Sequence, residues 1–269
     1  MKKLLTIAGS DSSGGAGIQA DLKTFAALGT YGMSCICALT AQNTKGVSMV
    51  VNTPISLVKA QLEAIYDDVA PDAVKTGMLG TAAIVDTVSD FLGNHRSAPL
   101  VVDPVMVATS GDKLLEDDAI ALYKGKLIPL AALITPNIPE AEVLSGISIT
   151  SEQDRRKAAE ILMTFGCKAV LIKGGHHIMD ADDLLYDGKD FIAYPGERID
   201  TKNTHGTGCT LSSAIAASLA KGLPLEGAIE AAKDYLTGAI ARAKTDSVGH
   251  GHGPVHHFWF YGDTWGRMK

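Results

Sequence analysis

The sequence predicts an α/β fold, a three-layer α/β/α sandwich in which a mostly parallel central sheet carries helices on both faces. Two observations predict it. Segments that favour strands alternate with segments that favour helices through most of the chain. The strand segments are nearly all apolar, which is typical of parallel strands covered by helices on both sides. No linker or low-complexity stretch divides the 269 residues, so we expect a single domain over residues 1–269.

The alternation begins at the N-terminus. Residues 4–8 favour a short buried strand, and the glycine-rich residues 9–17 favour a loop that leads into a helix over residues 18–28. A second strand is expected over residues 32–40, a polar turn over 41–46 and another strand over 47–51. Pro54 is a favourable first residue for a helix over 54–68, and a further helix is expected over 81–92. Strands are expected over residues 73–76 and 99–103.

The second half continues this pattern and then departs from it. Helices are expected over residues 116–125, 139–145 and 152–165, and strands over 131–135 and 169–173. Residues 183–186 and 191–194 are joined by Asp187-Gly188, and such a dipeptide favours the tight turn of an antiparallel hairpin. Two helices should close the fold, one from near Gly208 to Lys221 and one over residues 225–243.

The composition favours small-molecule ligands. The net charge of -6 and the pI near 5.7 leave no basic stripe that could neutralise a nucleic-acid backbone, so we expect no nucleic-acid partner. No apolar run approaches the ~18 residues of a membrane span, and the apolar residues after Met1 are too few for a signal peptide. We therefore expect no membrane association and a cytoplasmic location.

The cysteines and the histidine-rich tail suggest packing more than metal binding. Four cysteines are too few and too scattered for a disulfide scaffold, and we expect reduced thiols. Cys35 and Cys37 would face one side of a strand and pack in the core. Residues 249–257 carry four histidines among glycines. A mobile or surface tail is favoured there over a metal site.

Residues 204–221 have the features of an anion-binding loop that runs into a helix. Gly206 and Gly208 free the backbone, and the following residues are rich in Ala, Leu and Ser. The first amides of the helix would lack intrahelical partners at the positive end of the helix dipole, where phosphate binds well. Cys209 would lie there, and a thiol at a helix N-terminus ionises more easily. It is a candidate for proton transfer, although a tight turn with an inert thiol fits the same pattern.

Polar residues follow several of the expected strands. In such folds ligands bind at the carboxyl ends of the strands. Asp103 follows a buried strand, and a carboxylate there would need a cation as a partner. Magnesium would be a suitable one. Asn137 and Glu140 could bind a ligand, cap a helix, or do both. Lys173 ends a strand beside two glycines and could reach a phosphate, so these residues together favour phosphoryl transfer from a nucleotide.

Two other nucleotide-binding patterns fit poorly. Residues 15–20 match the dinucleotide fingerprint G-x-G-x-x-A after a strand, but no acidic residue lies between Asp21 and Glu63 to hold the ribose. The pattern G-x-x-x-x-G-K-[ST] does not occur. A phosphate would therefore have to bind at the Gly206 loop.

Seven motifs in register resemble the hydroxymethylpyrimidine/phosphomethylpyrimidine kinases of thiamine biosynthesis, members of the ribokinase-like superfamily. They are GSDSSGGAGIQADLKTF, AQNT, VKTGML, VVDPVM, ITPNIPEAE, KGGH and HGTGCT. The resemblance implies a kinase, usually dimeric, that uses ATP and Mg²⁺. Its substrates would be 4-amino-5-hydroxymethyl-2-methylpyrimidine and then the monophosphate, which becomes the diphosphate. The need for a monovalent cation stays open.

The resemblance also implies roles for residues. Gln42 would pair with the aminopyrimidine edge, with Gly9, Asp21, Met78 and Val105 lining the same pocket. Asp103 and Glu140 would lie on the magnesium side, and the nucleotide side would also include Asn137, Lys173, Thr204 and the loop Gly206, Thr207, Gly208 and Cys209. The wider superfamily commonly has Asp as the base where this chain has Cys209, which leaves the identity of the base open.

Two alternatives remain. Pyridoxal kinase has the same fold and is the second candidate. Gln42 favours the pyrimidine, because its side chain can accept from the exocyclic amine and donate to the adjacent ring nitrogen, a pair that pyridoxal does not present. A non-catalytic pyrimidine sensor would be expected to have a degraded phosphate loop, whereas this loop is intact.

Overall fold

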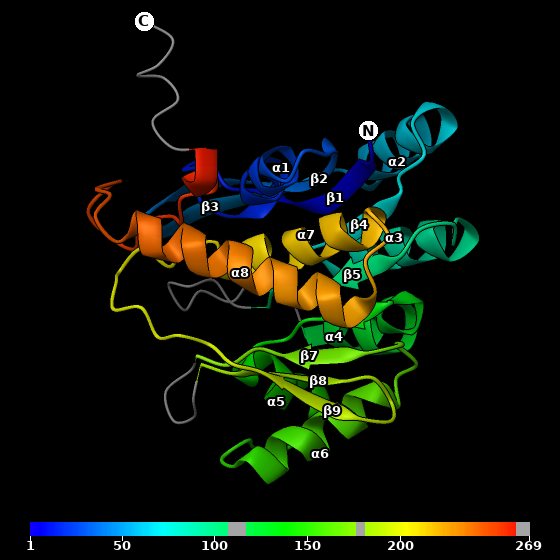
Figure 1. The fold of residues 1–269 in the computed structure, drawn as a ribbon. Helices are drawn as coiled ribbons and strands as arrows, with labels where there is room; N and C mark the ends of the chain where they lie inside the picture. Colours follow the sequence, from blue (N-terminus) through cyan, green and yellow to red (C-terminus); the bar gives the residue numbers. More distant parts are fainter. Residues whose placement is uncertain (107–116, 176–180, 262–269) are drawn as a thin grey trace, which may run out of the picture.

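The computed structural model describes residues 1–106, 117–175 and 181–261, and these contain one nine-stranded sheet in the order β3-β2-β1-β4-β5-β6-β7-β8-β9 (Figure 1). The strands are β1 (Lys3–Ser10), β2 (Tyr31–Asn43), β3 (Gly46–Asn52), β4 (Ala73–Thr76), β5 (Leu100–Val102), β6 (Leu133–Ile134), β7 (Val170–Ile172), β8 (Asp183–Tyr186) and β9 (Phe191–Tyr194). All neighbours from β2 to β7 pair in parallel. Antiparallel pairing is confined to β3 at one edge and to the β8–β9 hairpin at the other. The predicted mostly parallel sheet is confirmed.

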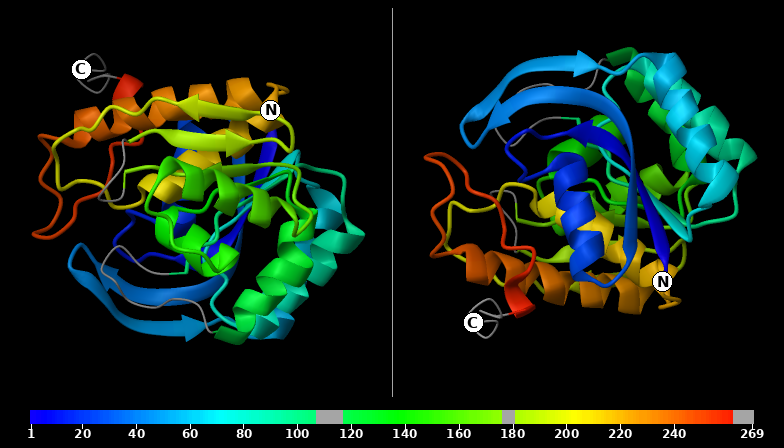
Figure 2. Two further views of the ribbon diagram at one scale, coloured as in Figure 1. Left: turned by 90° about the horizontal axis from the view of Figure 1, so that it is seen from below. Right: turned by 90° about the horizontal axis from the view of Figure 1, so that it is seen from above.

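Helices cover both faces of the sheet (Figures 1 and 2). Neighbouring side chains of a strand point to opposite faces, so Leu4 packs into one buried cluster and Leu5 into the other. The cluster of Leu4 includes residues of α1 (Gly17–Ala27), α7 (Thr207–Ala220) and α8 (Leu225–Ala243). The cluster of Leu5 includes residues of α2 (Ile55–Asp68), α3 (Ala82–Asn94), α4 (Asp117–Leu122), α5 (Ile138–Ser145) and α6 (Glu152–Met163). The predicted three-layer sandwich follows from this alternation.

Side chains at the helix starts fix several boundaries. Thr81 accepts a hydrogen bond from the amide of Ile84 at the start of α3, and Ser151 accepts one from the amide of Asp154 at the start of α6.

Cys35 and Cys37 are fully buried in the core, as predicted. Among the helices of the described ranges, none is long and apolar enough to cross a membrane.

Two expected element bounds are corrected. Strand β2 continues to Asn43, where a turn was expected from residue 41, because Ala41 to Asn43 pair with β3. The helix expected over residues 116–125 ends at Leu122 and passes into a π-helical turn, Tyr123–Leu127, and a 3-10 turn, Ile128–Leu130; its expected first residue lies outside the described ranges. A further 3-10 turn, Trp259–Tyr261, was not predicted.

The tail over residues 249–257 is the third correction, because it packs against the fold. The amide of His252 donates to the carbonyl of Thr44 at 2.8 Å, and the amide of His205 donates to the carbonyl of Gly253 at 3.0 Å. His257 is only 4% exposed, and its carbonyl accepts from the hydroxyl of Tyr235 at 2.6 Å. Apolar burial of Val255 and these bonds outweigh the flexibility of the glycines.

Candidate active site

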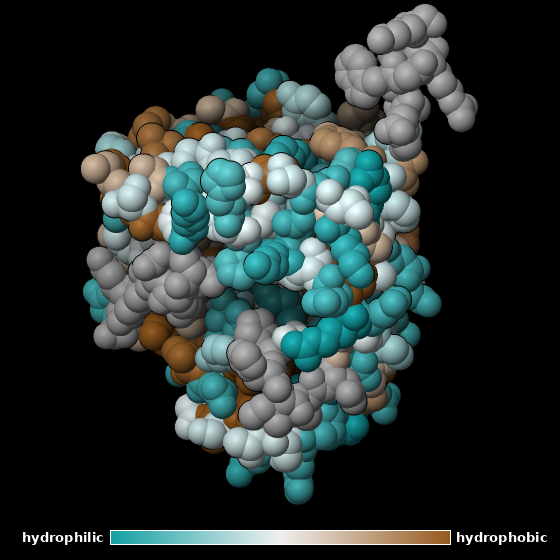
Figure 3. Space-filling view, turned by 90° about the vertical axis from the view of Figure 1, so that its left-hand side faces the viewer, coloured by the Kyte–Doolittle hydropathy of each residue, from teal (hydrophilic) through white to brown (hydrophobic). Residues whose placement is uncertain are grey.

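The carboxyl ends of the parallel strands meet on one face of the molecule, where the N-terminus of α7 also lies. Figure 3 shows this face hollowed, with hydrophilic residues in and around the hollow. The polar residues that follow β1, β5, β6 and β7 in the sequence therefore lie at the same face of the molecule. The hollow is the place expected for ligands in folds of this class.

The anion loop has the predicted geometry. Helix α7 begins at Thr207, and its N-cap Gly206 is left-handed, with φ 81°. A side chain at Gly206 would clash with the carbonyl oxygen of Gly15, so only glycine fits there. Within the described residues no side chain caps this helix start. The first amides of α7, including those of Gly208 and Cys209, are therefore available to an anion.

Lys173 and Asp103 meet beside this helix start. The ammonium of Lys173 donates to Asp103 Oδ1 at 2.7 Å, and Asp103 is 1% exposed. A Cβ added to Gly208 would lie 3.2 Å from Lys173 Nζ and 3.6 Å from Asp103 Oδ2. Burial alone would raise the pKa of Asp103, but the charges of Lys173 and Lys75 hold it below its usual range. The pair therefore carries opposite charges next to the amides of α7.

Glu140 serves two purposes in the structure. It forms a capping box with Asn137: Asn137 Oδ1 accepts from the amide of Glu140 at 2.8 Å, and Glu140 Oε2 accepts from the amide of Asn137 at 2.9 Å. Burial raises the pKa of Glu140 to about 7; the charge of Lys173 opposes the rise and that of Asp103 adds to it. The capping role considered from the sequence is thus present, in a side chain that also belongs to the charged cluster.

The residues fit a magnesium ion that is bound partly by phosphate. Asp103 and Glu140 supply two hard carboxylate donors, and a bound cation would favour the ionised form of Glu140, whose pKa burial raises to about 7. Among the described side chains, no group of three or more His, Cys, Asp or Glu is placed to hold a metal alone. Mg²⁺ usually binds through one or two carboxylates together with substrate phosphates, so this donor set is compatible with it.

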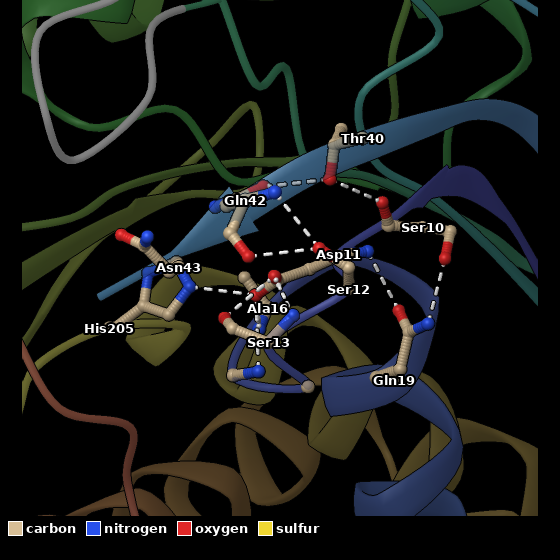
Figure 4. A network of polar contacts seen from close by, with 12 residues as sticks. Ser10, Asp11, Ser12, Ser13, Ala16, Gln19, Thr40, Gln42, Asn43 and His205 are labelled. Atoms are coloured by element: carbon tan, nitrogen blue, oxygen red, sulfur yellow. Dashed lines mark hydrogen bonds and ion pairs between the residues drawn. The ribbon is translucent and has the colours of Figure 1, made fainter. Parts of the chain in front are cut away.

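Of the residues predicted for the pyrimidine side, Gly9 and Met78 are in direct contact, and Thr204 precedes the phosphate loop. The amide of Gly9 donates to the carbonyl of Met78 at 3.0 Å, and Val105 follows Asp103 in a tight turn with a 2.9 Å backbone bond. At the end of β2 the amide of Gln42 donates to Ser12 Oγ at 2.9 Å (Figure 4). The carbonyl of Thr204 accepts from the amide of Thr207 at 3.3 Å.

Asp21 is placed differently from the prediction. Its carboxylate is 0% exposed and bonds Lys75 Nζ at 2.9 and 3.0 Å, Thr6 Oγ1 at 2.6 Å and Ser213 Oγ at 2.7 Å. These partners use both oxygens of the carboxylate, and the side chain lies below the surface that a substrate could reach. Lys75 is the partner that the sequence analysis missed, because it lies far along the chain on β4.

Lys75→Met should therefore cost about 3 to 5 kcal/mol of unfolding free energy, because it leaves the Asp21 carboxylate buried without its cation. The double variant Lys75→Met/Asp21→Asn should recover a large part of the loss, since the Asn side chain carries no charge, its Oδ1 can accept from one of the hydroxyls of Thr6 and Ser213, and its Nδ2 can donate to the oxygen of the other. Urea unfolding measures both. The predicted substrate role of Asp21 would be upheld instead if Asp21→Asn kept wild-type stability and raised only the KM of the pyrimidine.

Cys209 lies in the first turn of α7, as predicted, but its thiol is not activated. Burial raises its pKa to about 11; Lys75 opposes the rise, and the charges of Asp21 and Asp103 add to it. The expectation that the helix N-terminus eases ionisation is therefore wrong for this structure. The helix dipole is a local effect, and burial with two nearby carboxylates outweighs it.

Cys209 should accordingly react with iodoacetamide about 10²-fold more slowly than free glutathione at pH 7.5, because only the thiolate is alkylated. The rate should rise about tenfold per pH unit from pH 7 to 9.5. Peptide mass spectrometry assigns the site, with Cys209→Ser as the control. Fast alkylation at pH 7 that levels off above pH 8 would instead support the original expectation of a thiol that ionises easily.

Comparison with known proteins identifies the family of the sequence. Residues 11–256 match the family model described as phosphomethylpyrimidine kinase. A hydroxymethylpyrimidine/phosphomethylpyrimidine kinase from Rhizobium meliloti is 51% identical over 256 residues, which cover 94% of this chain and 96% of the relative. The resemblance to the pyrimidine kinases of thiamine biosynthesis is thereby confirmed.

Two solved structures are similar to this chain over most of its length. Phosphomethylpyrimidine kinase from Clostridium difficile 630 is 47% identical, with a TM-score of 0.81 over 89% of this chain and 100% of that chain. The pyridoxal kinase from Staphylococcus aureus in complex with AMP-PCP and pyridoxal is 37% identical, with a TM-score of 0.88 over 98% and 96% of the two chains. These similarities confirm the predicted ribokinase-like sandwich. With a matching family model over most of its length, the chain belongs to the phosphomethylpyrimidine kinase family.

Proposed function

We propose that this chain uses ATP to phosphorylate 4-amino-5-hydroxymethyl-2-methylpyrimidine and then phosphorylates the monophosphate to the diphosphate. The observation that carries the proposal is the convergence of the free amides of α7 with Lys173 and Asp103, near the end of β2, where Gln42 contacts the loop after β1 (Figure 4). An acceptor held by Gln42 and a phosphate held by the loop would share one hollow. The family and its relatives support this substrate class.

The residues have distinct proposed roles in phosphoryl transfer. The amides of Gly206, Gly208 and Cys209 and the ammonium of Lys173 would stabilise negative charge on the phosphoryl group as it moves to the substrate oxygen. Asp103 and Glu140 would hold Mg²⁺, which when bound neutralises charge on the nucleotide phosphates. Asn137 and Thr204 would flank the nucleotide. Binding of AMP-PCP by a related kinase of the same fold supports ATP as the donor.

The proton of the substrate hydroxyl needs an acceptor. Cys209 is adjacent, but its thiol is neutral at pH 7 because burial raises its pKa to about 11. A loose phosphoryl transition state needs little help from a base. We therefore assign the loop amides and Lys173 the larger share of the catalysis and Cys209 a contact with the substrate.

Pyridoxal is the second candidate substrate. It is favoured by the similarity to pyridoxal kinases, which extends over nearly the whole chain. Gln42 favours the pyrimidine, because its Nε2 and the remaining lone pair of Oε1 match an exocyclic amine and ring nitrogen. Thr40 Oγ1 lies 3.2 Å from that Oε1 and directs its single proton mainly to the carbonyl of Ser10 at 2.8 Å, so Oε1 keeps a lone pair for a ligand.

Steady-state kinetics with ATP and Mg²⁺ test the proposal. The purified protein is offered the pyrimidine, its monophosphate and pyridoxal side by side, and kcat/KM is compared. We expect both pyrimidines to exceed pyridoxal. A higher kcat/KM for pyridoxal, with no turnover of the pyrimidines, would replace the proposed substrate.

We also propose a homodimer located in the cytoplasm. The edge strand β3 and the neighbouring β2 present exposed apolar side chains, with Leu39 at 56%, Met49 at 62% and Val51 at 56% exposure. An exposed apolar sheet edge favours association with a second copy. Light scattering of the purified protein should give twice the mass of the chain, and Met49→Asp should shift it toward the monomer.

A further inference from the structure

The loop that follows β1 and the loop that precedes α7 are joined by a buried acid–imidazole pair. His205 Nε2 lies 2.8 Å from Asp11 Oδ2, and the two residues are 7% and 2% exposed (Figure 4). Neither residue has a role in the site as described so far. A buried pair of this kind, placed between two functional loops, can fix their relative position.

Asp11 organises its own loop. Its carboxylate accepts from the amide and hydroxyl of Ser13 at 2.8 and 2.7 Å, and from the amides of Gly15 and Ala16 at 3.1 and 2.8 Å. Burial alone would raise its pKa, but the bonds from His205 and Ser13 hold the pKa well below its usual range. Asp11 therefore remains a carboxylate that gathers the loop around itself.

His205 anchors the other loop directly before Gly206. Its backbone amide donates to the carbonyl of Gly253, which fixes its main chain to the packed tail. A side chain added to Gly15 would clash with the ring of His205, and one added to Gly206 would clash with the carbonyl of Gly15. The two loops are thus in backbone contact, and the pair spans that contact.

The Asp11 loop also touches the end of β2. Ser12 Oγ accepts from the amide of Gln42 and donates to its carbonyl, both at 2.9 Å. A chain of contacts therefore runs from Gln42 through Ser12 to Asp11, and from His205 to the first amides of α7. This chain links the proposed acceptor side of the hollow to the phosphate loop.

We propose that Asp11 and His205 are positioning residues that hold the phosphate loop, residues 206–209, in register with the end of β2. Neither side chain touches the reacting atoms. The inference rests on the proposed phosphoryl transfer only for its kinetic readout. A misplacement of about 1 Å in catalytic groups can reduce turnover about 10²-fold.

His205→Leu tests the pair, because Leu fills much of the ring volume without a donor, whereas His205→Gln can still donate an amide N–H to Asp11. We expect His205→Leu to lower kcat about 10²-fold and to weaken binding of AMP-PCP with Mg²⁺ about tenfold. The KM of the acceptor should change less than about threefold, because Asp11 keeps its bonds within its own loop. His205→Gln should recover most of the loss.

Two controls separate positioning from folding. His250→Leu makes the same exchange at an exposed residue and should behave as wild type. A thermal melt of each variant reports stability, and Asp11→Asn, which keeps the shape of the side chain, replaces His205→Leu if the latter does not fold. In a double-mutant cycle the losses of Asp11→Asn and His205→Leu should be less than additive.

The experiment distinguishes failure of the inference about Asp11 and His205 from failure of the proposed function. If the wild type phosphorylates neither pyrimidine nor pyridoxal, the proposed function fails, and AMP-PCP binding alone decides on the pair. Values of kcat and AMP-PCP affinity within twofold of wild type in a folded His205→Leu protein would overturn the inference. An equal loss in the Leu and Gln variants would also overturn it, because it would show that the donated hydrogen bond is not what matters.

Discussion

Gly208→Val should reduce turnover about 10²-fold or more while leaving acceptor binding nearly intact. A Cβ at this position already approaches Lys173 Nζ to 3.2 Å, and the Val methyl groups would fill the space between this ammonium and the amides of α7. Donors aimed at a developing charge lose their effect when a phosphoryl group can no longer reach them. The loss should appear in kcat and only weakly in the KM of the acceptor.

Gly93→Val is the matched control for this variant. Gly93 lies in α3, where an added Cβ would meet nothing within 4 Å, so the exchange tests the added side chain without the site. Gly208→Ala should fall between wild type and Gly208→Val. Wild-type turnover in a folded Gly208→Val protein would remove the loop amides from the mechanism.

Gln42→Met should lower kcat/KM for the pyrimidine roughly 10² to 10³-fold and affect pyridoxal much less. Met keeps the approximate volume but removes both proposed hydrogen bonds, and each unpaired polar atom of the buried substrate costs about 1 to 3 kcal/mol. The two hydrogen bonds with Ser12 are made by the backbone of Gln42, so the variant keeps the contact between β2 and the loop of Asp11. ATP affinity should not change.

A purely structural role of Gln42 makes a different prediction. Its side chain would then serve only to support the end of β2, where Oε1 lies 3.2 Å from Thr40 Oγ1. Losses would be equal on both substrates and would accompany a lower melting temperature. Such parallel losses would exclude Gln42 as the residue that selects the pyrimidine and would favour the pyridoxal assignment.

The fold could be predicted where local patterns decide the structure. The β8–β9 hairpin and helix α8 have the predicted bounds, because a turn dipeptide and helical periodicity are readable within a few residues. The end of β2 was misjudged because polar Gln42 and Asn43 are typical of a turn, and pairing with β3 decides otherwise. Pairing between strands is a tertiary property that composition does not report.

The site could be predicted in its motifs but not in its long-range pairs. Lys173, Asp103 and Gly208 come together, as expected for residues at the carboxyl ends of strands and at a helix start of the same sheet edge. Contacts such as Asp21 to Lys75, 54 residues apart, and Asp11 to His205, 194 residues apart, leave no trace in one sequence. The high pKa of Cys209 likewise depends on burial and on charges from other elements.

The packed tail illustrates the same limit. Glycine and histidine in residues 249–257 are typical of a mobile segment, and nothing local indicates a partner. The structure supplies partners from three distant elements, through Thr44, His205 and Tyr235. Composition could therefore predict the polarity of this segment but not its docking.

A product time course tests the central claim most directly. The purified protein is incubated with excess ATP, Mg²⁺ and 4-amino-5-hydroxymethyl-2-methylpyrimidine, and nucleotides and pyrimidines are quantified together by chromatography with mass spectrometry. We predict that the monophosphate rises and then falls, that the diphosphate is the end product, and that about two ADP form per pyrimidine consumed, as the proposed sequence of two phosphoryl transfers requires. A reaction that ends at the monophosphate, or ADP formation without phosphorylated pyrimidine, would contradict the account.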